Sequence, residues 1–291
     1  MRHNQKRSIP SLLRAAALTA LVLALVCFVL LAVSKVREAG EKRAEDRLRD
    51  LYEGAVSENA GFSLINGAAE ESVAESFSEL YAINPELVGW IRAGSDISDP
   101  VVRRDNEYYL NHDFYGDSSV SGTVFADEEN RDWVSDPYVL LYGHNMKNDT
   151  MFGMMDHYLL KSYLAENARV RFHWICEDEP REYVPFAMLD ISADPESGDY
   201  FHLRRYDLFD PERQADPEQF RADVLSFVNE IREKAQWQIP EIPVDETDAI
   251  LGLVTCGYGR EDGRLVLFCR ALRDGETPEQ MAETVRQSVA P

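Results

Sequence analysis

Cysteine and positive charge are both scarce in this sequence. Its four cysteines form no CxxC pair, which argues against a thioredoxin-like redox protein. Lys and Arg number 30 against 52 Asp and Glu, so the formal net charge is −22. Because nucleic-acid binding requires positive charge to neutralise phosphates, this balance excludes a nucleic-acid-binding protein. The sequence also has no internal repeat, which excludes a repeat architecture.

Long hydrophobic runs are equally rare, with a single uncharged one at residues 15–34. At about 1.5 Å per residue, a helix of this length spans roughly 30 Å, the thickness of the hydrocarbon core of a bilayer. Four basic residues precede it, so the positive-inside rule predicts a cytoplasmic N-terminus and an extracellular remainder. A cleaved signal peptide is the alternative, although its apolar core would be unusually long. We therefore predict a single-pass protein of the cell membrane.

The period of the apolar residues changes along the rest of the chain. Residues 35–69 are charged and helix-prone, and residues 70–83 have apolar residues at helical spacing. From Val88 onward, many short β-prone runs are separated by turn residues, which indicates a barrel or sandwich. Two helical stretches interrupt this β pattern, at residues 151–166 and 216–236.

A thiol and a guanidinium lie at the ends of two neighbouring β-prone runs. Cys256 ends the first run, and Arg264 begins the second after a glycine-rich loop. This pair suits acyl transfer, in which a thiolate attacks a carbonyl and a fixed cation stabilises the charge that develops on oxygen. A small buried cysteine in a hairpin is the alternative, because free cysteines are often part of the core.

A histidine occupies a third strand end. The apolar run at residues 138–142 leads directly into Gly143, His144 and Asn145. A lone histidine is more often structural than catalytic. Loops at the ends of strands in a rigid sheet, however, usually carry function. Three reactive side chains at strand ends therefore favour a catalytic site.

Several short motifs surround these residues: VGWI (88–91), PVV (100–102), DNEYYL (105–110), GTVFAD (122–127), YGHNM (142–146), MF (151–152), TC (255–256) and GRLV (263–266). With these motifs the sequence resembles the sortases, the membrane-anchored cysteine transpeptidases of Gram-positive cell surfaces, and class B in particular. Several separated motifs in the right order make the resemblance specific, and it covers roughly residues 80–272. It implies a mostly β fold with appended helices. The expected core is a closed, sortase-type eight-stranded β-barrel with N-terminal helices and a long helix before the cysteine strand.

The resemblance also implies roles for the three side chains. Cys256 would be the nucleophile that forms a thioester, His144 the proton carrier, and Arg264 the group that holds the substrate carbonyl or the oxyanion. The backbone N–H of Gly257 would be a second oxyanion donor. Arg260, in the same loop, is the rival for the arginine role.

The remaining site predictions concern the groove for the substrate. Family members imply that Asn106 and Leu110 line this groove, and that the aromatic pair Tyr200 and Phe201 does likewise. Thr255 keeps the family residue before the cysteine. Val254 departs from the family, in which a Ser or Thr often stands at this position, so a hydroxyl contact is missing here.

The function implied is cleavage of a C-terminal sorting signal after Thr, with transfer of the surface protein to an amine of peptidoglycan precursor or of a pilin. A secreted cysteine peptidase or peptidoglycan hydrolase, and a non-catalytic adhesin, are the alternatives. We expect no cofactor and no metal, since the HxxC of His173 and Cys176 has no second pair of suitable spacing. The predicted organisation is a basic N-terminus (1–14), an anchor (15–34), a spacer (35–69), a catalytic domain (70–273) and a tail (274–291).

Overall fold

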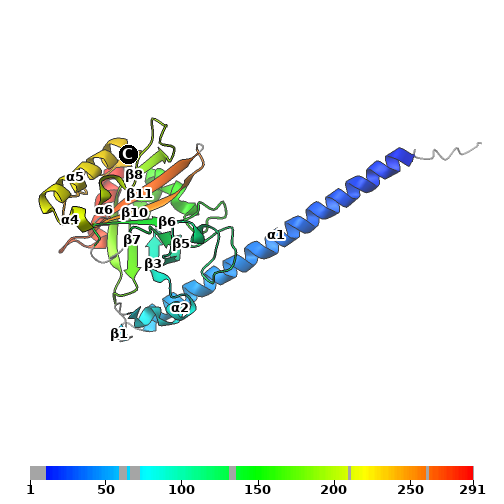
Figure 1. Cartoon of the computed structure of the whole chain (residues 1–291), viewed down its shortest axis with the longest axis horizontal. Coiled ribbons are helices and arrows are strands. Elements are labelled where there is room, and N and C mark those ends of the chain that lie inside the picture. The colour runs from blue at the N-terminus through cyan, green and yellow to red at the C-terminus, as the bar shows by residue number, and fades with distance from the viewer. Residues whose placement is uncertain are drawn as a thin grey trace, which may run out of the picture. The chain divides into compact units, whose positions relative to one another are not determined.

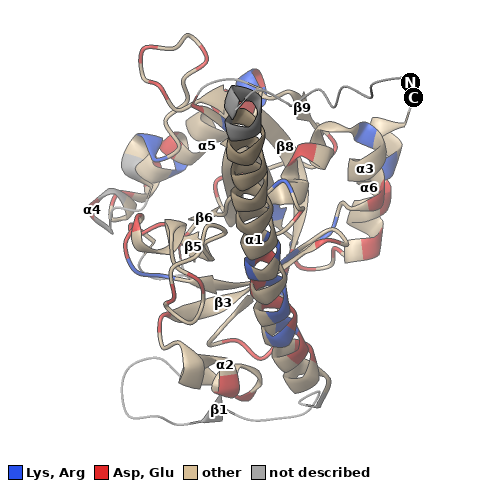
Figure 2. Ribbon diagram, turned by 90° about the vertical axis from the view of Figure 1, so that its right-hand side faces the viewer, with Lys and Arg blue, Asp and Glu red and all other residues tan. Residues whose placement is uncertain are grey.

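The computed structural model describes residues 11–58, 64–65, 73–130, 136–208, 211–259 and 262–290, and these form two compact units, Met1–Arg47 and Leu48–Pro291. Most of helix α1 (Ser11–Glu58) belongs to the first unit. Figure 2 shows an uncharged run in this helix followed by closely spaced charges. The apolar run is long enough to cross a bilayer, with a mean hydropathy of 3.0, and its side chains are exposed. An apolar N-terminal helix of this kind is typical of a membrane anchor or a signal sequence.

The second unit is built on a closed β-barrel (Figure 1). Its strands are β3 (Leu87–Ala93), β4 (Ile97–Val102), β5 (Val124–Ala126), β6 (Tyr138–Tyr142), β7 (Val170–Trp174), β8 (Arg181–Ser192), β10 (Ile250–Gly257) and β11 (Gly263–Ala271). The order is β11-β10-β6-β5-β4-β3-β7-β8, and pairing of β8 with β11 closes the barrel. The short strand β9 (Trp237–Gln238) adds to β8. The eight-stranded barrel predicted from the sequence is confirmed.

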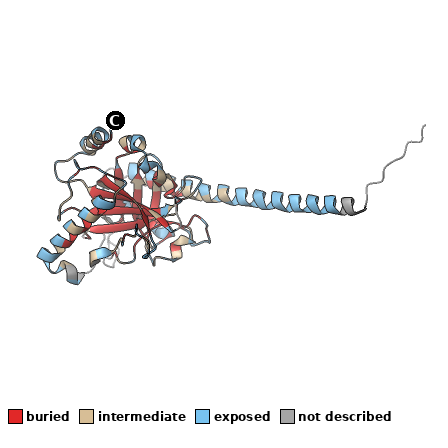
Figure 3. Cartoon of the chain, turned by 90° about the horizontal axis from the view of Figure 1, so that it is seen from above, coloured by how far each residue is buried: buried red, intermediate tan, exposed pale blue. Residues whose placement is uncertain are grey.

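Burial of apolar side chains inside the barrel holds the strands together. Figure 3 shows the barrel strands as the most buried part of the chain. Strands β8, β10 and β11 are buried along nearly their whole length, because the barrel interior covers one face and helices or loops cover much of the other. This explains why they read as continuous apolar runs rather than as alternating ones.

Several helices flank the barrel. They are α2 (Ser78–Ile83), α3 (Lys161–Glu166), α4 (Pro211–Gln214), α5 (Pro217–Lys234) and α6 (Pro278–Val289), with the 3-10 helices η1 (Glu75–Phe77), η2 (Tyr108–Leu110), η3 (Gly153–Leu159) and η4 (Arg205–Asp207). The predicted long helix before the cysteine strand is confirmed as α5. Its Asp216 cap accepts a 3.2 Å hydrogen bond from the Gln219 N–H, and it buries Val224, Phe227, Val228 and Ile231.

Two predicted helices differ from the structure. The helix expected over residues 70–83 is only α2 preceded by η1, because residues 73–74 form the short strand β2, which pairs with β1 (Leu64–Ile65). Part of that expected helix, residues 70–72, lies outside the described residues. The helix expected over residues 151–166 is η3 followed by α3. Leu160 separates them with an extended backbone, φ −90° and ψ 119°.

A second apolar core lies outside the barrel. Leu48 and Tyr52 from the last turns of α1 pack there with Phe77, Leu80 and Trp90. The compact unit therefore begins at Leu48, well before residue 70, where the sequence placed the start of the catalytic domain.

Candidate active site

Two parallel strands bring the histidine and the cysteine to the same edge of the barrel. Strands β6 and β10 run side by side, with Tyr142 opposite Val254. His144 and Cys256 each follow two residues later. The Gly143 N–H donates to the Val254 carbonyl at 3.1 Å, and the Thr255 hydroxyl donates to the Gly143 carbonyl at 2.7 Å. These bonds hold the two strand ends in register where the reactive side chains begin.

The arginine comes from the neighbouring antiparallel strand. Strand β11 pairs with β10 so that Arg264 lies directly opposite Cys256. The Arg264 side chain is half-buried and donates from Nη1 to the Gly263 carbonyl at 2.8 Å, whereas Cys256 is exposed. A cation thus lies across the strand pair from an accessible thiol.

The electrostatics favour an ionised pair. A hydrogen bond with His144 lowers the pKa of the Cys256 thiol against the opposing effect of burial, and the charges of Arg264 and His144 lower it further. The same hydrogen bond raises the pKa of His144, against partial burial. His144 Nε2 lies 2.8 Å from the Leu110 carbonyl, which only accepts, so Nε2 carries a proton and Nδ1 is left to exchange one with the thiol. A thiolate beside an imidazolium is the arrangement of an activated cysteine nucleophile.

Comparison with known proteins agrees with this geometry. No family model matches the chain. It is 24% identical over 234 residues to Sortase B of Listeria monocytogenes, covering 79% of this chain and 86% of that protein, and 26% identical over 216 residues to Sortase B of Staphylococcus aureus, covering 73% and 81%. The solved sortase B of Clostridium perfringens is 28% identical, with a TM-score of 0.55 and coverage of 67% of this chain and 99% of that one. These similarities support a class B sortase. The enzyme is accordingly a cysteine transpeptidase.

The fold is also similar to that of a solved sortase B–substrate complex from Staphylococcus aureus. That structure is 21% identical, with a TM-score of 0.63, and the match covers 82% of this chain and 99% of the other. At this identity the likeness concerns the fold alone.

Asn145 is a residue of the site that the sequence reasoning missed. Its buried Nδ2 donates to the Cys256 carbonyl at 2.8 Å and to Asp156 Oδ1 at 2.9 Å, and the Tyr258 hydroxyl donates to its carbonyl. One side chain therefore ties the cysteine strand to the loop that carries His144. Its position directly after the histidine was the available signal.

A second missed group begins at Tyr142, two residues before His144 on β6. The Tyr142 hydroxyl donates at 2.7 Å to Asp127, a fully buried carboxylate that Arg204 approaches at 3.6 Å. Burial and the Asp127 charge raise the pKa of Tyr142 well above its usual range, while the charges of Arg204 and Arg264 oppose the rise. The ring of Tyr142 thus lies within electrostatic reach of both guanidinium groups.

Of the residues predicted to line the groove, Leu110 and Gly257 lie at the site. The Leu110 carbonyl contacts His144, and Gly257 follows the cysteine opposite Gly263. Thr255 is at the site too, but its hydroxyl is buried and bound to the backbone of Gly143.

The other residues predicted to line the groove make contacts of their own. Tyr200 lies near the start of β11, because its bridge partner Ser192 is opposite Gly263, next to Arg264. Asn106 exchanges hydrogen bonds with Glu128, whose N–H donates to its Oδ1 at 3.0 Å. Phe201 is buried in the core against Phe227, with ring centroids 5.7 Å apart, while half-buried Tyr200 bridges to Ser192 through its backbone. The rival Arg260 lies outside the described residues.

The remaining cysteines and the HxxC pair have structural surroundings. Cys269 is buried and Cys176 is half-buried, and neither forms a disulfide. Both ring nitrogens of His173 are engaged, Nδ1 with the Tyr52 hydroxyl and Nε2 with the Glu177 carbonyl, each at 2.9 Å. Within the described ranges, no group of three His, Cys, Asp or Glu side chains is arranged to hold a metal ion.

Proposed function

We propose that the sortase cleaves the C-terminal sorting signal of a surface protein after Thr, with Cys256 as nucleophile, His144 as proton carrier and Arg264 as the oxyanion-stabilising group. The observation that supports these roles most directly is the convergence of the three side chains. Arg264 lies directly across the β10–β11 pair from Cys256, and His144 follows the neighbouring strand β6 in the same register as Cys256 follows β10. The interaction with His144 lowers the pKa of the thiol.

The roles of Cys256 and His144 follow from the lowered pKa of the thiol and the raised pKa of the imidazole. The Cys256 thiolate attacks the scissile carbonyl, and the oxyanion that forms is stabilised by the guanidinium of Arg264 and by the N–H of Gly257. The tetrahedral intermediate collapses with loss of the amine, which takes its proton from His144. The product is a thioester on Cys256, with the surface protein as the acyl group.

The second half of the reaction reverses these steps with another amine. We propose an amine of peptidoglycan precursor, or a pilin lysine, as the acceptor. His144 takes the proton of this amine as it attacks the thioester, and the Cys256 thiolate leaves. The apolar run of α1 would anchor the enzyme with its N-terminus in the cytoplasm and the barrel outside the cell.

Peptide cleavage with and without an added amine tests the proposal. We expect Cys256→Ala in the detergent-solubilised full-length enzyme to abolish cleavage of peptides from a sorting-signal library. Cys176→Ala removes a half-buried thiol elsewhere and serves as the matched control, with activity retained. Added amine should shift the product of the unmodified enzyme from the free acid to the amide. Undiminished cleavage by Cys256→Ala would refute the nucleophile assignment, and hydrolysis that ignores the amine would refute transfer.

A further inference from the structure

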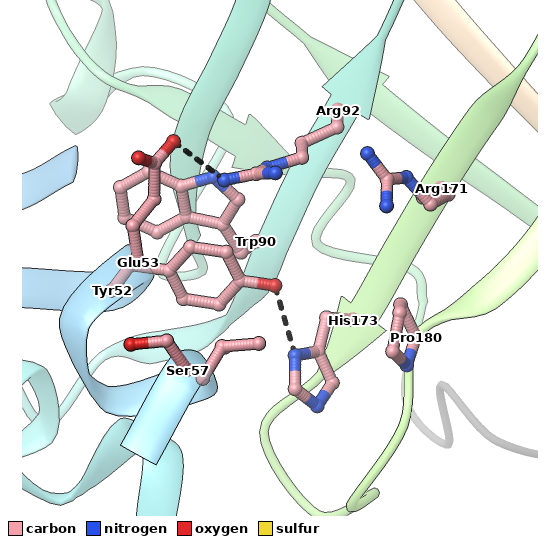
Figure 4. A pocket seen from close by; sticks show the side chains of 9 residues that line it. Tyr52, Glu53, Ser57, Trp90, Arg92, Arg171, His173 and Pro180 are labelled. Carbon is pink, nitrogen blue, oxygen red and sulfur yellow. Dashed lines mark hydrogen bonds and ion pairs between the residues drawn. The ribbon is translucent and has the colours of Figure 1, made fainter. Parts of the chain in front are cut away.

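A cavity of about 310 Å³ lies between the last turns of α1 and the outer face of β3 and β7 (Figure 4). Tyr52 and Glu53 come from the helix, Trp90 and Arg92 from β3, and Arg171 and His173 from β7. All of these residues belong to the unit that contains the barrel.

The cavity is remote from the catalytic edge. Strand β8 pairs with both regions, placing Glu182 opposite Arg171 and Ile191 opposite Arg264. Nine residues of extended strand separate these two positions, which is about 30 Å at ~3.3 Å per residue. The cavity is therefore a different site from the one that holds Cys256.

Two positive charges face each other across neighbouring strands in this cavity. Arg92 and Arg171 are directly opposite in the antiparallel β3–β7 pair. Like charges at such positions repel and destabilise a sheet. The pKa of Arg171 is accordingly lowered, by burial first and then by the charges of Arg169 and Arg92, with Glu182 opposing. An anion between the two guanidinium groups would remove this repulsion.

Neither guanidinium has its hydrogen-bonding capacity filled within the described part of the chain. Arg92 Nη2 donates to Glu53 Oε1 at 2.7 Å, but its Nε is buried and has no acceptor there. The side chain of Arg171 makes no hydrogen bond or close ion pair with another described residue, although the charge of Glu182 acts on it. Its neighbour Glu182 is bound instead by Arg169, at 2.9 and 2.5 Å.

The charge balance selects the type of anion. Glu53 offsets one of the two arginines. Burial lowers the pKa of His173, whose Nδ1 accepts from the Tyr52 hydroxyl while Nε2 donates to a carbonyl, so the ring is neutral. Among the residues that line the cavity, one net positive charge remains, which matches a monoanion. A planar carboxylate fits the fork of a guanidinium.

The wall of the cavity suits the rest of such a ligand. Tyr52 stacks on Trp90, with ring centroids 4.4 Å apart and planes 3° apart, and Pro180 lines the opposite side (Figure 4). We propose that this cavity binds a small monoanionic carboxylate, such as the free C-terminus of a peptide, between Arg92 and Arg171. Because its walls come from both α1 and the barrel, the bound ligand would tie the last turns of the helix to β3 and β7.

Binding can be followed at Trp90, which lines the cavity and whose indole N–H donates to the Ser98 hydroxyl at 3.0 Å. The full-length enzyme in non-ionic detergent is titrated with N-acetylglycine at neutral pH while the NMR signal of this N–H is recorded. N-acetylglycinamide has the same skeleton without the charge, and inorganic phosphate tests an anion of higher charge. We expect a saturable shift with the acid, none with the amide, and weaker binding of phosphate.

Variants identify the cation responsible. Arg171→Gln should weaken binding of N-acetylglycine by about tenfold or more, since the charged hydrogen bonds from the guanidinium to the ligand carboxylate are lost. Arg171→Lys keeps the charge but lacks the paired N–H donors of the guanidinium, so it should bind with intermediate affinity. This variant replaces Arg171→Gln in the test if Arg171→Gln folds poorly. Arg286→Gln removes an exposed charge on α6 and should leave binding unchanged. Equal binding of the amide, tighter binding of phosphate, no saturable shift, or binding unaffected by both Arg171 variants would overturn the proposal.

Discussion

Replacement of Asn145 by alanine should damage both stability and catalysis, because this side chain joins the two strand ends of the active site. The change removes the hydrogen bonds from Nδ2 to the Cys256 carbonyl and to Asp156 Oδ1, at 2.8 and 2.9 Å. Asn145 is 5% exposed, so water does not readily replace the lost donor. A hydrogen bond to a charged group contributes about 1.5–3 kcal/mol and a neutral one about 0.5–1.5 kcal/mol. The free energy of unfolding should therefore fall by about 2–4 kcal/mol.

The catalytic effect should appear mainly in kcat. Asn145 fixes the backbone that carries Cys256, and no contact between its side chain and the substrate is proposed. A misplacement of about 1 Å in reacting groups costs up to about 100-fold in rate. We expect kcat for sorting-signal cleavage to fall by about 10- to 100-fold with little change in KM.

Two further variants test this role of the Asn145 side chain. Asn148→Ala, in the same loop, removes an exposed asparagine. Among the described residues its side chain accepts only from the Thr150 hydroxyl, so the effect on unfolding should stay within about 0.5 kcal/mol. Asn145→Asp keeps the shape but directs a carboxylate at Asp156 and at a carbonyl, so it should destabilise at least as much as alanine. Urea unfolding and steady-state cleavage measure both quantities. Native stability in Asn145→Asp, or an equal loss in Asn148→Ala, would contradict the role assigned here.

Three other changes test the site and its scaffold. The rate of alkylation of Cys256 by iodoacetamide should rise with pH around a midpoint below that of an ordinary thiol, because the pKa of Cys256 is lowered. His144→Ala should move that midpoint upward. An unmoved midpoint would rule out the hydrogen bond with His144 as the main cause of the lowered pKa. Phe227→Ala empties a fully buried position among aromatic rings and should cost about 3–5 kcal/mol in chemical denaturation, whereas a loss below about 1 kcal/mol would contradict the packing. Glu276→Ala leaves the fully buried Arg270 without its 2.9 Å partner and should cost about 3 kcal/mol or more, with Glu276→Gln costing less in the same assay.

Much of the fold was predictable because its signals are local. Short β-prone runs separated by turns, with a proline-started helix at residue 217, indicate a barrel with a long helix before the last strands, and the topology confirms both. The helix expected over residues 151–166 was only partly right. Apolar spacing does not reveal the extended residue, Leu160, at which the 3-10 helix gives way to α3.

The sequence by itself determined which side chains stand at strand ends, and His144, Cys256 and Arg264 were predicted as catalytic residues in this way. Tertiary structure alone decided which of the other residues meet. It put Asn145 against the Cys256 carbonyl, buried Phe201 against Phe227, and set Arg92 opposite Arg171. The physical reason is that the pattern of neighbouring apolar and polar residues shows where a strand begins and ends. Strand register and side-chain burial depend instead on contacts between segments far apart in the chain.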